Sequence, residues 1–184
     1  MDLELRRKLL HSLFGLVLIL IIFYFERKIL IIFLSLLLLF GSIMIVWRLQ
    51  GNRIPIAGWF EETFERKNVR FPGYGAFWYV VGSLFLALSL SNANEIAAAI
   101  LTLALGDSAA TIFGIRGVHP IPYNHRKTIE GSIAFLIFSL PSCLLVGWMG
   151  LPLVFLTAVA ESLPVPCDDN LLIPFVAALF FIIV

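Results

Sequence analysis

The sequence predicts an all-α fold: a polytopic helical membrane protein with about seven transmembrane helices and a cytoplasmic N-terminus. Of its 184 residues, 60% are hydrophobic and only 14% are charged, and its mean hydropathy is +0.99. Soluble domains are about 45–50% apolar and about a quarter charged. A soluble fold of this length cannot bury so much apolar surface, so the lipid bilayer must be the solvent for most of the chain.

Apolar runs separated by short polar breaks give the predicted spans, because a membrane helix needs about 20 residues and at least about 17. The seven runs are Leu9–Phe25, Ile29–Trp47, Tyr74–Leu90, Glu95–Phe113, Ile129–Met149, Leu151–Leu163 and Leu171–Val184. The first five qualify or nearly so. For the short last two, half-length helices or a tight pair that dips into the protein are alternatives to full spans. Pro141 lies inside the fifth run and should kink it.

The longest polar stretch, from Arg48 to Gly73, interleaves aromatic and charged residues. Phe60 and Phe64 are spaced to share one helical face, as are Glu62 and Arg66. This pattern predicts a short amphipathic helix on the membrane surface at about 52–70. Because the chain has no internal repeat and no low-complexity tail, residues 1–184 are expected to form a single integral membrane domain.

Basic residues favour a cytoplasmic N-terminus, since they collect on the cytoplasmic side of membrane proteins. With seven spans, only Arg27 and Lys28 of the 13 basic residues fall outside. The remaining eleven are Arg6, Arg7, Lys8, Arg48, Arg53, Arg66, Lys67, Arg70, Arg116, Arg126 and Lys127. The same topology brings three polar segments to the cytoplasmic face, at 105–114, 124–132 and 161–170.

Asp107 is the most informative residue of the first segment. It lies about two turns inside the end of its helix, where a carboxylate is costly unless it is paired or bound to a cation. A magnesium ligand and a structural ion pair with an Arg or Lys are both possible, and the first suits the site better. Gly106, Ala110 and Gly114 form a small-residue face that lets another helix approach closely.

The second segment combines cations with the start of a helix near Thr128–Ile129. Arg126 and Lys127 beside helix N-terminal amides predict an anion site, to which the side chains of Thr128 and Ser132 can add donors. Glu130 either stabilises the helix dipole or serves as a second metal ligand.

The third segment places two adjacent carboxylates, Asp168 and Asp169, just before the last span. Asp169 or Asn170 can act as a helix cap. Together with Glu161 and the loop prolines, however, the pair suggests a stiff loop that holds a divalent cation or a base over the membrane surface.

Carboxylates for magnesium, cations for phosphate and a membrane location together predict phosphoryl or nucleotidyl transfer to a lipid. A net charge of +1 offers no electrostatic case for a nucleic-acid partner. The two cysteines, Cys143 and Cys167, show no spacing that indicates a disulfide framework or a zinc site.

At these residues the sequence resembles a known enzyme family. The segment from Gly106 to Gly117, the segment from Arg126 to Ser132, and Glu161 followed by 168–170 resemble the dolichol kinase, phytol kinase and yeast-type diacylglycerol kinase family. The resemblance implies a lipid-alcohol kinase that uses CTP and a divalent cation. The Gly-Asp and Lys-Thr-x-Glu-Gly elements are also similar to those of CDP-lipid synthases, whose C-terminal Asp-Arg signature this chain lacks.

The predicted function is transfer of the γ-phosphate of CTP to the hydroxyl of a membrane lipid alcohol such as dolichol or polyprenol. The predicted catalytic residues are Asp107, Lys127, Glu130, Asp168 and Asp169. The predicted magnesium ligands are Asp107, Glu130 and Asp169. The predicted nucleotide-binding residues are Arg126, Lys127, Thr128, Gly131, Ser132 and Asn170. A cytidylyltransferase that forms a CDP-lipid and a small transporter with a buried Asp are the alternatives, and the sequence leaves the lipid and the oligomeric state open.

Overall fold

The all-α prediction is confirmed by a computed structural model, which describes residues 3–52, 55–66 and 69–184. The α-helices are α1 (Leu3–Leu49), α2 (Pro55–Phe64), α3 (Tyr74–Ser89), α4 (Ala93–Leu101), α5 (Asp107–Gly114), α6 (Ile129–Ser139), α7 (Cys143–Val146), α8 (Gly150–Ser162) and α9 (Asp169–Ile183). The sequence did not predict the small antiparallel hairpin of β1 (Pro120–Ile121) and β2 (Asn124–Thr128), in which Pro120 pairs with Thr128. Three helical stretches, 3–49, 93–114 and 129–162, are long and apolar enough to cross a membrane.

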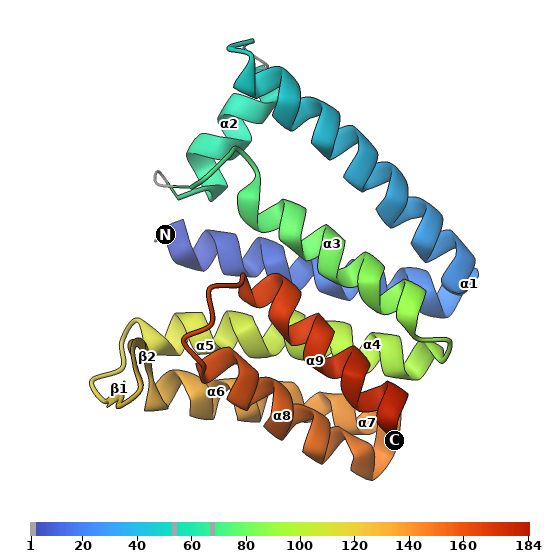
Figure 1. Cartoon of the computed structure of the whole chain (residues 1–184), viewed down its shortest axis with the longest axis vertical. Helices are drawn as coiled ribbons and strands as arrows, with labels where there is room; N and C mark the ends of the chain where they lie inside the picture. The colour runs from blue at the N-terminus through green and yellow to red at the C-terminus, as the bar shows by residue number, and fades with distance from the viewer. Residues whose placement is uncertain (1–2, 53–54, 67–68) are drawn as a thin grey trace.

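Helix α1 contains the predicted break between the first two apolar runs. At Glu26 the backbone takes φ 71° and ψ 157°, a conformation that side-chain-bearing residues rarely adopt, and the two halves of the helix diverge there (Figure 1). The next residue, Arg27, donates from Nε to the carbonyl of Ala87 at 2.7 Å and from Nη2 to that of Leu88 at 3.2 Å. Because the last carbonyls of a helix lack partners within it, Arg27 anchors the turn of α1 on the end of α3.

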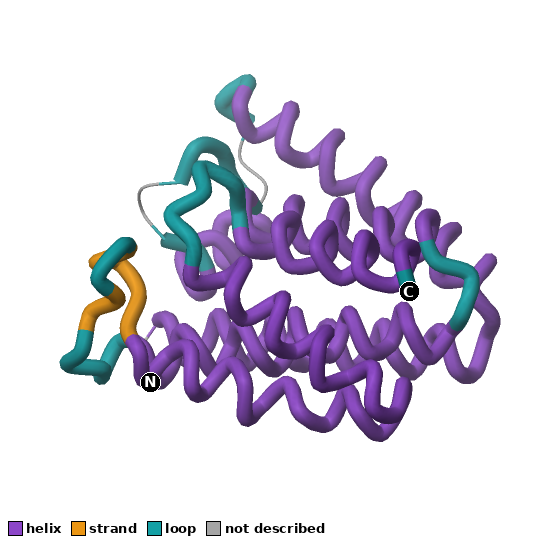
Figure 2. The backbone as a smooth tube through the Cα atoms, turned by 60° about the horizontal axis from the view of Figure 1, so that its bottom comes forward, coloured by secondary structure: helices purple, strands orange, loops and turns teal. Residues whose placement is uncertain are grey.

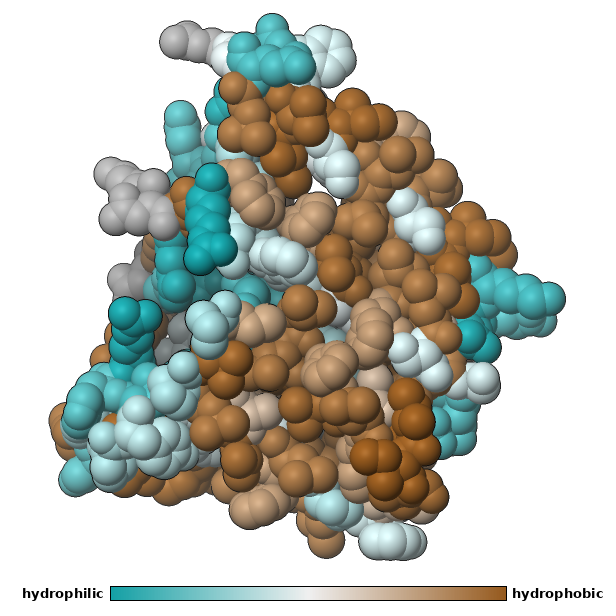
Figure 3. Space-filling model, in the orientation of Figure 1, coloured by the Kyte–Doolittle hydropathy of each residue, from teal (hydrophilic) through white to brown (hydrophobic). Residues whose placement is uncertain are grey.

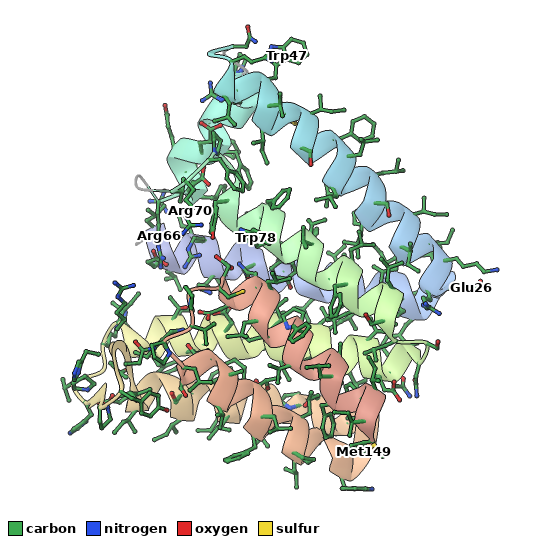
Figure 4. All side chains as sticks on the ribbon, in the orientation of Figure 1. Glu26, Trp47, Arg66, Arg70, Trp78 and Met149 are labelled. Carbon is green, nitrogen blue, oxygen red and sulfur yellow. The ribbon has the colours of Figure 1, made fainter. Side chains whose placement is uncertain are left out.

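The helical segments run between two ends of the molecule, and the polar surface gathers mainly at one of them. The N-terminus, the β hairpin and most of the loops share this end (Figures 1 and 2). Hydrophilic surface follows the same edge, with apolar surface across the middle and a smaller polar patch at the opposite end (Figure 3). Arg66 and Arg70 lie at the first end, whereas Glu26 and Met149 lie at the second (Figure 4). We call the first the polar end of the bundle.

The fourth predicted span forms the core. It consists of α4, a π-helical turn at Thr102–Gly106 and α5, and it contacts α1, α6 and α9. The predicted small-residue face is confirmed, since α6 lies directly against it. A Cβ atom on Gly106 would stand 2.2 Å from the Ser139 hydroxyl, and one on Gly131 would stand 2.8 Å from the carbonyl of Ala110.

The fifth predicted span and the two short helices also follow the predicted pattern. A 3-10 turn at Leu140–Ser142 interrupts the fifth span at Pro141, as a residue without an amide hydrogen requires. A second 3-10 turn, Gly147–Met149, begins with Gly147 at φ 62° and leads into α8. Helices α8 and α9 have 13 and 15 residues, so each is shorter than a bilayer-spanning helix.

The predicted amphipathic helix is present but shorter than expected. Helix α2 brings the rings of Phe60 and Phe64 to 5.0 Å, as their spacing predicted. It ends at Phe64, so Arg66 does not share its face with Glu62 and binds Glu4 of α1 instead. Arg53 and Lys67, which entered the orientation argument, lie outside the described residues.

Candidate active site

The three polar segments that the sequence singled out line one pocket at the polar end of the bundle. The pocket has a volume of about 350 Å³. The side chains around it come from α1, the segment after α2, α5, β2, α6, α8 and the start of α9. They are Arg7, Lys8, Arg66, Asp107, Ala110, Thr111, Gly114, Ile115, Arg126, Lys127, Thr128, Gly131, Ser132, Glu161, Asp168, Asp169 and Asn170. Nine of the ten predicted site residues are among them, and Glu130 is the exception.

Asp107 lies at the deep side of the pocket and is paired with a lysine. Its side chain is 3% exposed and that of Lys8 is 4% exposed, and Lys8 Nζ donates to Asp107 Oδ2. His11 Nε2 lies 3.3 Å from the same oxygen. Lys8, which the sequence placed at the membrane boundary, is therefore buried. The pair matches the ion-pair alternative for Asp107, while both side chains still reach the pocket.

The π-helical turn before Asp107 explains how α1 docks beside it. The Asp107 amide donates to the carbonyl of Thr102, one residue further back than in an α-helix, so the carbonyl of Leu103 loses that partner. His11 Nε2 lies 3.1 Å from the Leu103 oxygen. Since a carbonyl only accepts hydrogen bonds, Nε2 carries the proton. Ser12 donates to the next carbonyl, that of Ala104, at 2.9 Å.

Lys127 ties the hairpin to the two C-terminal helices. Its ammonium group donates to Glu161 Oε1 at the end of α8 and to Asp169 Oδ2 at 2.8 Å. Burial by itself would lower the pKa of Lys127, but Asp169 and Glu161 outweigh that effect and raise the pKa above its ordinary value. The lysine therefore keeps its charge, and that charge is already shared between two carboxylates.

The start of α6 lies at the pocket wall as the sequence predicted. Thr128 is its N-cap: Thr128 Oγ1 accepts a hydrogen bond from the Gly131 amide at 3.2 Å and lies 3.3 Å from the Gly114 carbonyl. The cap thus uses the Gly131 amide that an anion site would otherwise offer. The hydroxyl of Ser132 is buried and has no hydrogen-bond partner among the described residues.

The start of α9 is capped by a different residue from those predicted. Asp168 is the N-cap, and its Oδ1 accepts from the Asn170 amide at 3.0 Å. Burial raises the pKa of Asp168, which this amide opposes and the neighbouring Asp169 reinforces. Asn170 donates from Nδ2 to the Gly75 carbonyl at 3.3 Å, whereas its buried Oδ1 has no partner in the described part of the chain.

Two arginines form a cationic flank of the pocket. Arg7 of α1 lies 2.7 Å from Glu4 Oε2, and Arg66, beyond α2, lies 2.5 Å from Glu4 Oε1. One carboxylate thus holds two guanidinium groups from distant segments, and both arginines line the pocket. We call Arg7 and Arg66 the arginine pair.

The predicted set of three magnesium ligands is not brought together. Glu130 points to the base of the hairpin, where its carboxylate accepts from the Val118 amide at 3.0 Å and lies 2.7 Å from His119 Nδ1. Within residues 3–52, 55–66 and 69–184, no three His, Cys, Asp or Glu side chains lie close enough to hold a metal ion by themselves. The position of Glu130 suits stabilisation of the hairpin and of the α6 dipole.

Sequence reasoning left four charged pocket residues out of the predicted site: Arg7, Lys8, Arg66 and Glu161. For Glu161 a signal existed, because a carboxylate at the end of an apolar run stands close to Asp168 and Asp169. Lys8 and His11 also had one, since their spacing puts both on a single helical face. Arg66 had none, because its place over the pocket depends on how α2 folds back on α1.

The comparisons with known proteins show a relative that aligns along most of this chain and of its own length. The chain is 32% identical over 178 residues to the uncharacterized protein MJ1137 of Methanocaldococcus jannaschii, an alignment that covers 95% of this chain and 91% of that protein. No family model matches the chain, and no solved structure matches it. At this identity and coverage, the chain belongs to the same protein family as MJ1137.

Proposed function

We propose that this protein is a lipid-alcohol kinase that transfers the γ-phosphate of CTP to the hydroxyl of a membrane lipid such as dolichol or polyprenol. The observation that supports it most is the pocket itself. Residues as far apart in the sequence as Arg7 and Asn170 meet there, and they combine carboxylates with cations at the polar end of an apolar bundle. Phosphoryl transfer needs this combination, since the protein mainly positions the reactants and neutralises charge. CTP and the alcohol acceptor follow from the family resemblance.

The charge balance of the pocket favours a nucleotide that arrives with a divalent cation. The pocket is lined by five cationic side chains and four carboxylates, and most of these form ion pairs with each other. A triphosphate therefore meets little surplus positive charge. Mg²⁺ is usually held by one or two carboxylates together with phosphate oxygens, so a pocket whose described residues include no cluster of three protein ligands still suits it.

Asp107, Asp169 and Asn170 are the residues that would hold Mg²⁺ with the phosphates. The Asn170 Oδ1 atom, buried and without a partner among the described residues, is the kind of oxygen ligand that this ion takes. Bound there, the ion would neutralise charge on the transferring phosphate. Arg126 and Lys127 from β2 would contact the phosphates, and the Ser132 hydroxyl would donate to one of their oxygens.

A second candidate, a cytidylyltransferase that forms a CDP-lipid, is favoured by the arginine pair. That reaction uses a lipid phosphate as the nucleophile, so it needs a cationic site in addition to the one for the nucleotide. Arg7 and Arg66 supply such a site on the side of the pocket formed by α1. The same pair can instead bind further phosphates of CTP, which keeps the kinase as the first candidate.

The label that reaches the lipid decides between the two reactions. Purified protein is incubated with a lipid extract, magnesium and CTP labelled in either the γ or the α position. We expect γ label in the lipid and release of CDP. Label from the α position with release of pyrophosphate would establish the cytidylyltransferase. No labelled lipid with either substrate would contradict both reactions and favour a transporter.

We further propose that the chain crosses the membrane seven times, with the short helices α8 and α9 as the last two crossings and with its N-terminus and this pocket on the cytoplasmic side. The partition of basic residues and the gathering of polar surface at one end support this topology (Figure 3).

Thiol labelling in sealed vesicles tests the topology with one native cysteine. Cys167 is exposed in the loop before α9, and Ser91 is exposed between α3 and α4. Two single-cysteine proteins are compared, and both carry Cys143→Ala. One keeps Cys167, and the other lacks Cys167 and carries Ser91→Cys. We expect the two cysteines to react from opposite sides of the membrane. Burial and the Asp168 carboxylate raise the pKa of the Cys167 thiol, so mildly alkaline buffer is required. Reaction of both from the same side would contradict seven crossings.

A further inference from the structure

Glu161 has a feature that sets it apart from the other pocket carboxylates. It lies in the last turn of α8, its side chain is 3% exposed, and its Oε1 accepts from Lys127. Its Oε2 is buried and has no hydrogen-bond partner among the described residues. A buried oxygen without a donor costs free energy, so this atom is suited to a ligand that brings a donor into the pocket.

The other carboxylates in the pocket have oxygens that already serve the protein. Asp107 Oδ2 binds Lys8, Asp168 Oδ1 caps α9, and Asp169 Oδ2 binds Lys127. In the part of the chain that the structure describes, Glu161 is the pocket carboxylate with a buried oxygen that no donor reaches. Lys127 holds its other oxygen, so the orientation of the carboxylate is set before any ligand binds.

We propose that Glu161 Oε2 binds the acceptor hydroxyl and takes its proton, which makes the acceptor an alcohol and not a phosphate. This inference rests on the proposed function and names the acceptor subsite within it. The O–H bond of the alcohol breaks and its proton passes to Oε2. The alcohol oxygen bonds to the γ-phosphorus, and the bond from that phosphorus to the bridging oxygen breaks. Its electron pair leaves with the nucleoside diphosphate, so atoms and charges balance.

The same atom disfavours a lipid phosphate in that position. A phosphate monoester carries up to two negative charges at neutral pH, and close approach of like charges in a site of low dielectric is unfavourable. An alcohol is neutral and supplies the donor that the carboxylate oxygen lacks. Glu161 therefore selects the chemical class of the acceptor, while the arginine pair is left for phosphates of the nucleotide.

The test compares Glu161→Gln with Glu161→Asp and with Glu62→Gln, a matched change at an exposed position of α2. Each protein is given labelled CTP with a polyprenol or with its phosphate ester, and binding of CTP is measured separately by equilibrium dialysis. The glutamine is nearly isosteric with glutamate but is not a base.

We expect the wild type to label the alcohol and not the ester. Glu161→Gln should lower turnover on the alcohol by about 100-fold or more, as for the loss of a general base, with CTP affinity kept within about threefold. Glu161→Asp should keep part of the activity, and Glu62→Gln should match the wild type.

Three results would overturn the inference alone. The first is labelling of the phosphate ester as well as the alcohol by the wild type, and the second is near-normal turnover by Glu161→Gln. The third is a parallel loss of CTP affinity and turnover in both Glu161 variants, because it would indicate a structural role. Failure of the wild type to label any lipid would instead overturn the proposed function.

Discussion

Replacing Asp107 with Asn is expected to abolish lipid labelling and to destabilise the fold at the same time. The variant leaves the Lys8 ammonium group buried without its counter-charge, and breaking a buried ion pair costs about 3–5 kcal/mol. Turnover should fall by orders of magnitude if Asp107 also holds the magnesium ion that neutralises the phosphates. Thermal unfolding in detergent and the CTP labelling assay measure the two effects separately.

The double variant Lys8→Met with Asp107→Asn separates structure from chemistry. Removing both charges should recover most of the stability lost in either single variant, because no unpaired charge remains buried. Activity should stay low in the double variant. Glu61→Gln is the control, since its pair with Arg48 lies outside the pocket and a solvent-accessible pair is worth about 0–1 kcal/mol. Recovery of turnover in the double variant would mean that Asp107 is purely structural.

Lys127→Met is expected to have the second largest effect. It would leave Glu161 and Asp169 as neighbouring carboxylates without their shared cation, so repulsion should loosen the contact between α8 and α9. It would also free Glu161 to rotate and remove one phosphate contact. Turnover should therefore fall by at least about 100-fold, the size expected when a positioned catalytic group is lost, and the unfolding temperature should drop.

Arg126→Gln is the matched comparison on the same strand. Arg126 lines the pocket but is exposed to solvent, so its loss should weaken CTP binding by about tenfold, the equivalent of about 1.4 kcal/mol, with little change in stability. Adding Asp169→Asn to Lys127→Met should restore stability but not turnover. If Arg126→Gln abolished activity while Lys127→Met stayed active, the assigned roles of the two cations would have to be exchanged.

Much of the helical architecture followed from local patterns. The break near Glu26, the interruption at Pro141 and the helix start at Thr128 were visible because each depends on a few adjacent residues. The close contact of α5 with α6 followed from the spacing of Gly106, Ala110 and Gly114, since small residues at one helical face permit close approach whatever the partner. The hairpin at 120–128 was missed, because two short strands carry too little periodicity to distinguish them from a loop.

The residues that line the candidate site were predicted better than the ion pairs between them. The lengths of the apolar runs and the distribution of basic residues were enough to predict that three distant polar segments lie at one end. Nine predicted residues line a single pocket there. The ion pair of Lys8 with Asp107 and the ion pairs of Glu4 with both members of the arginine pair could not be predicted. Each depends on the rotation and depth of one helix against another, and many such packings satisfy the same hydrophobic pattern.

The sequence by itself therefore determined that the chain is helical and mostly apolar and that its polar residues gather at one end. Each of these properties depends on the composition of short stretches of the chain. Only the tertiary structure decided which charges neutralise each other and which remain available to a ligand. Glu130 was excluded from the pocket and Glu161 was included for this reason. A difference of one helical turn, about 5.4 Å, exceeds the reach of a hydrogen bond, so side-chain partners are set by packing that no sequence motif specifies.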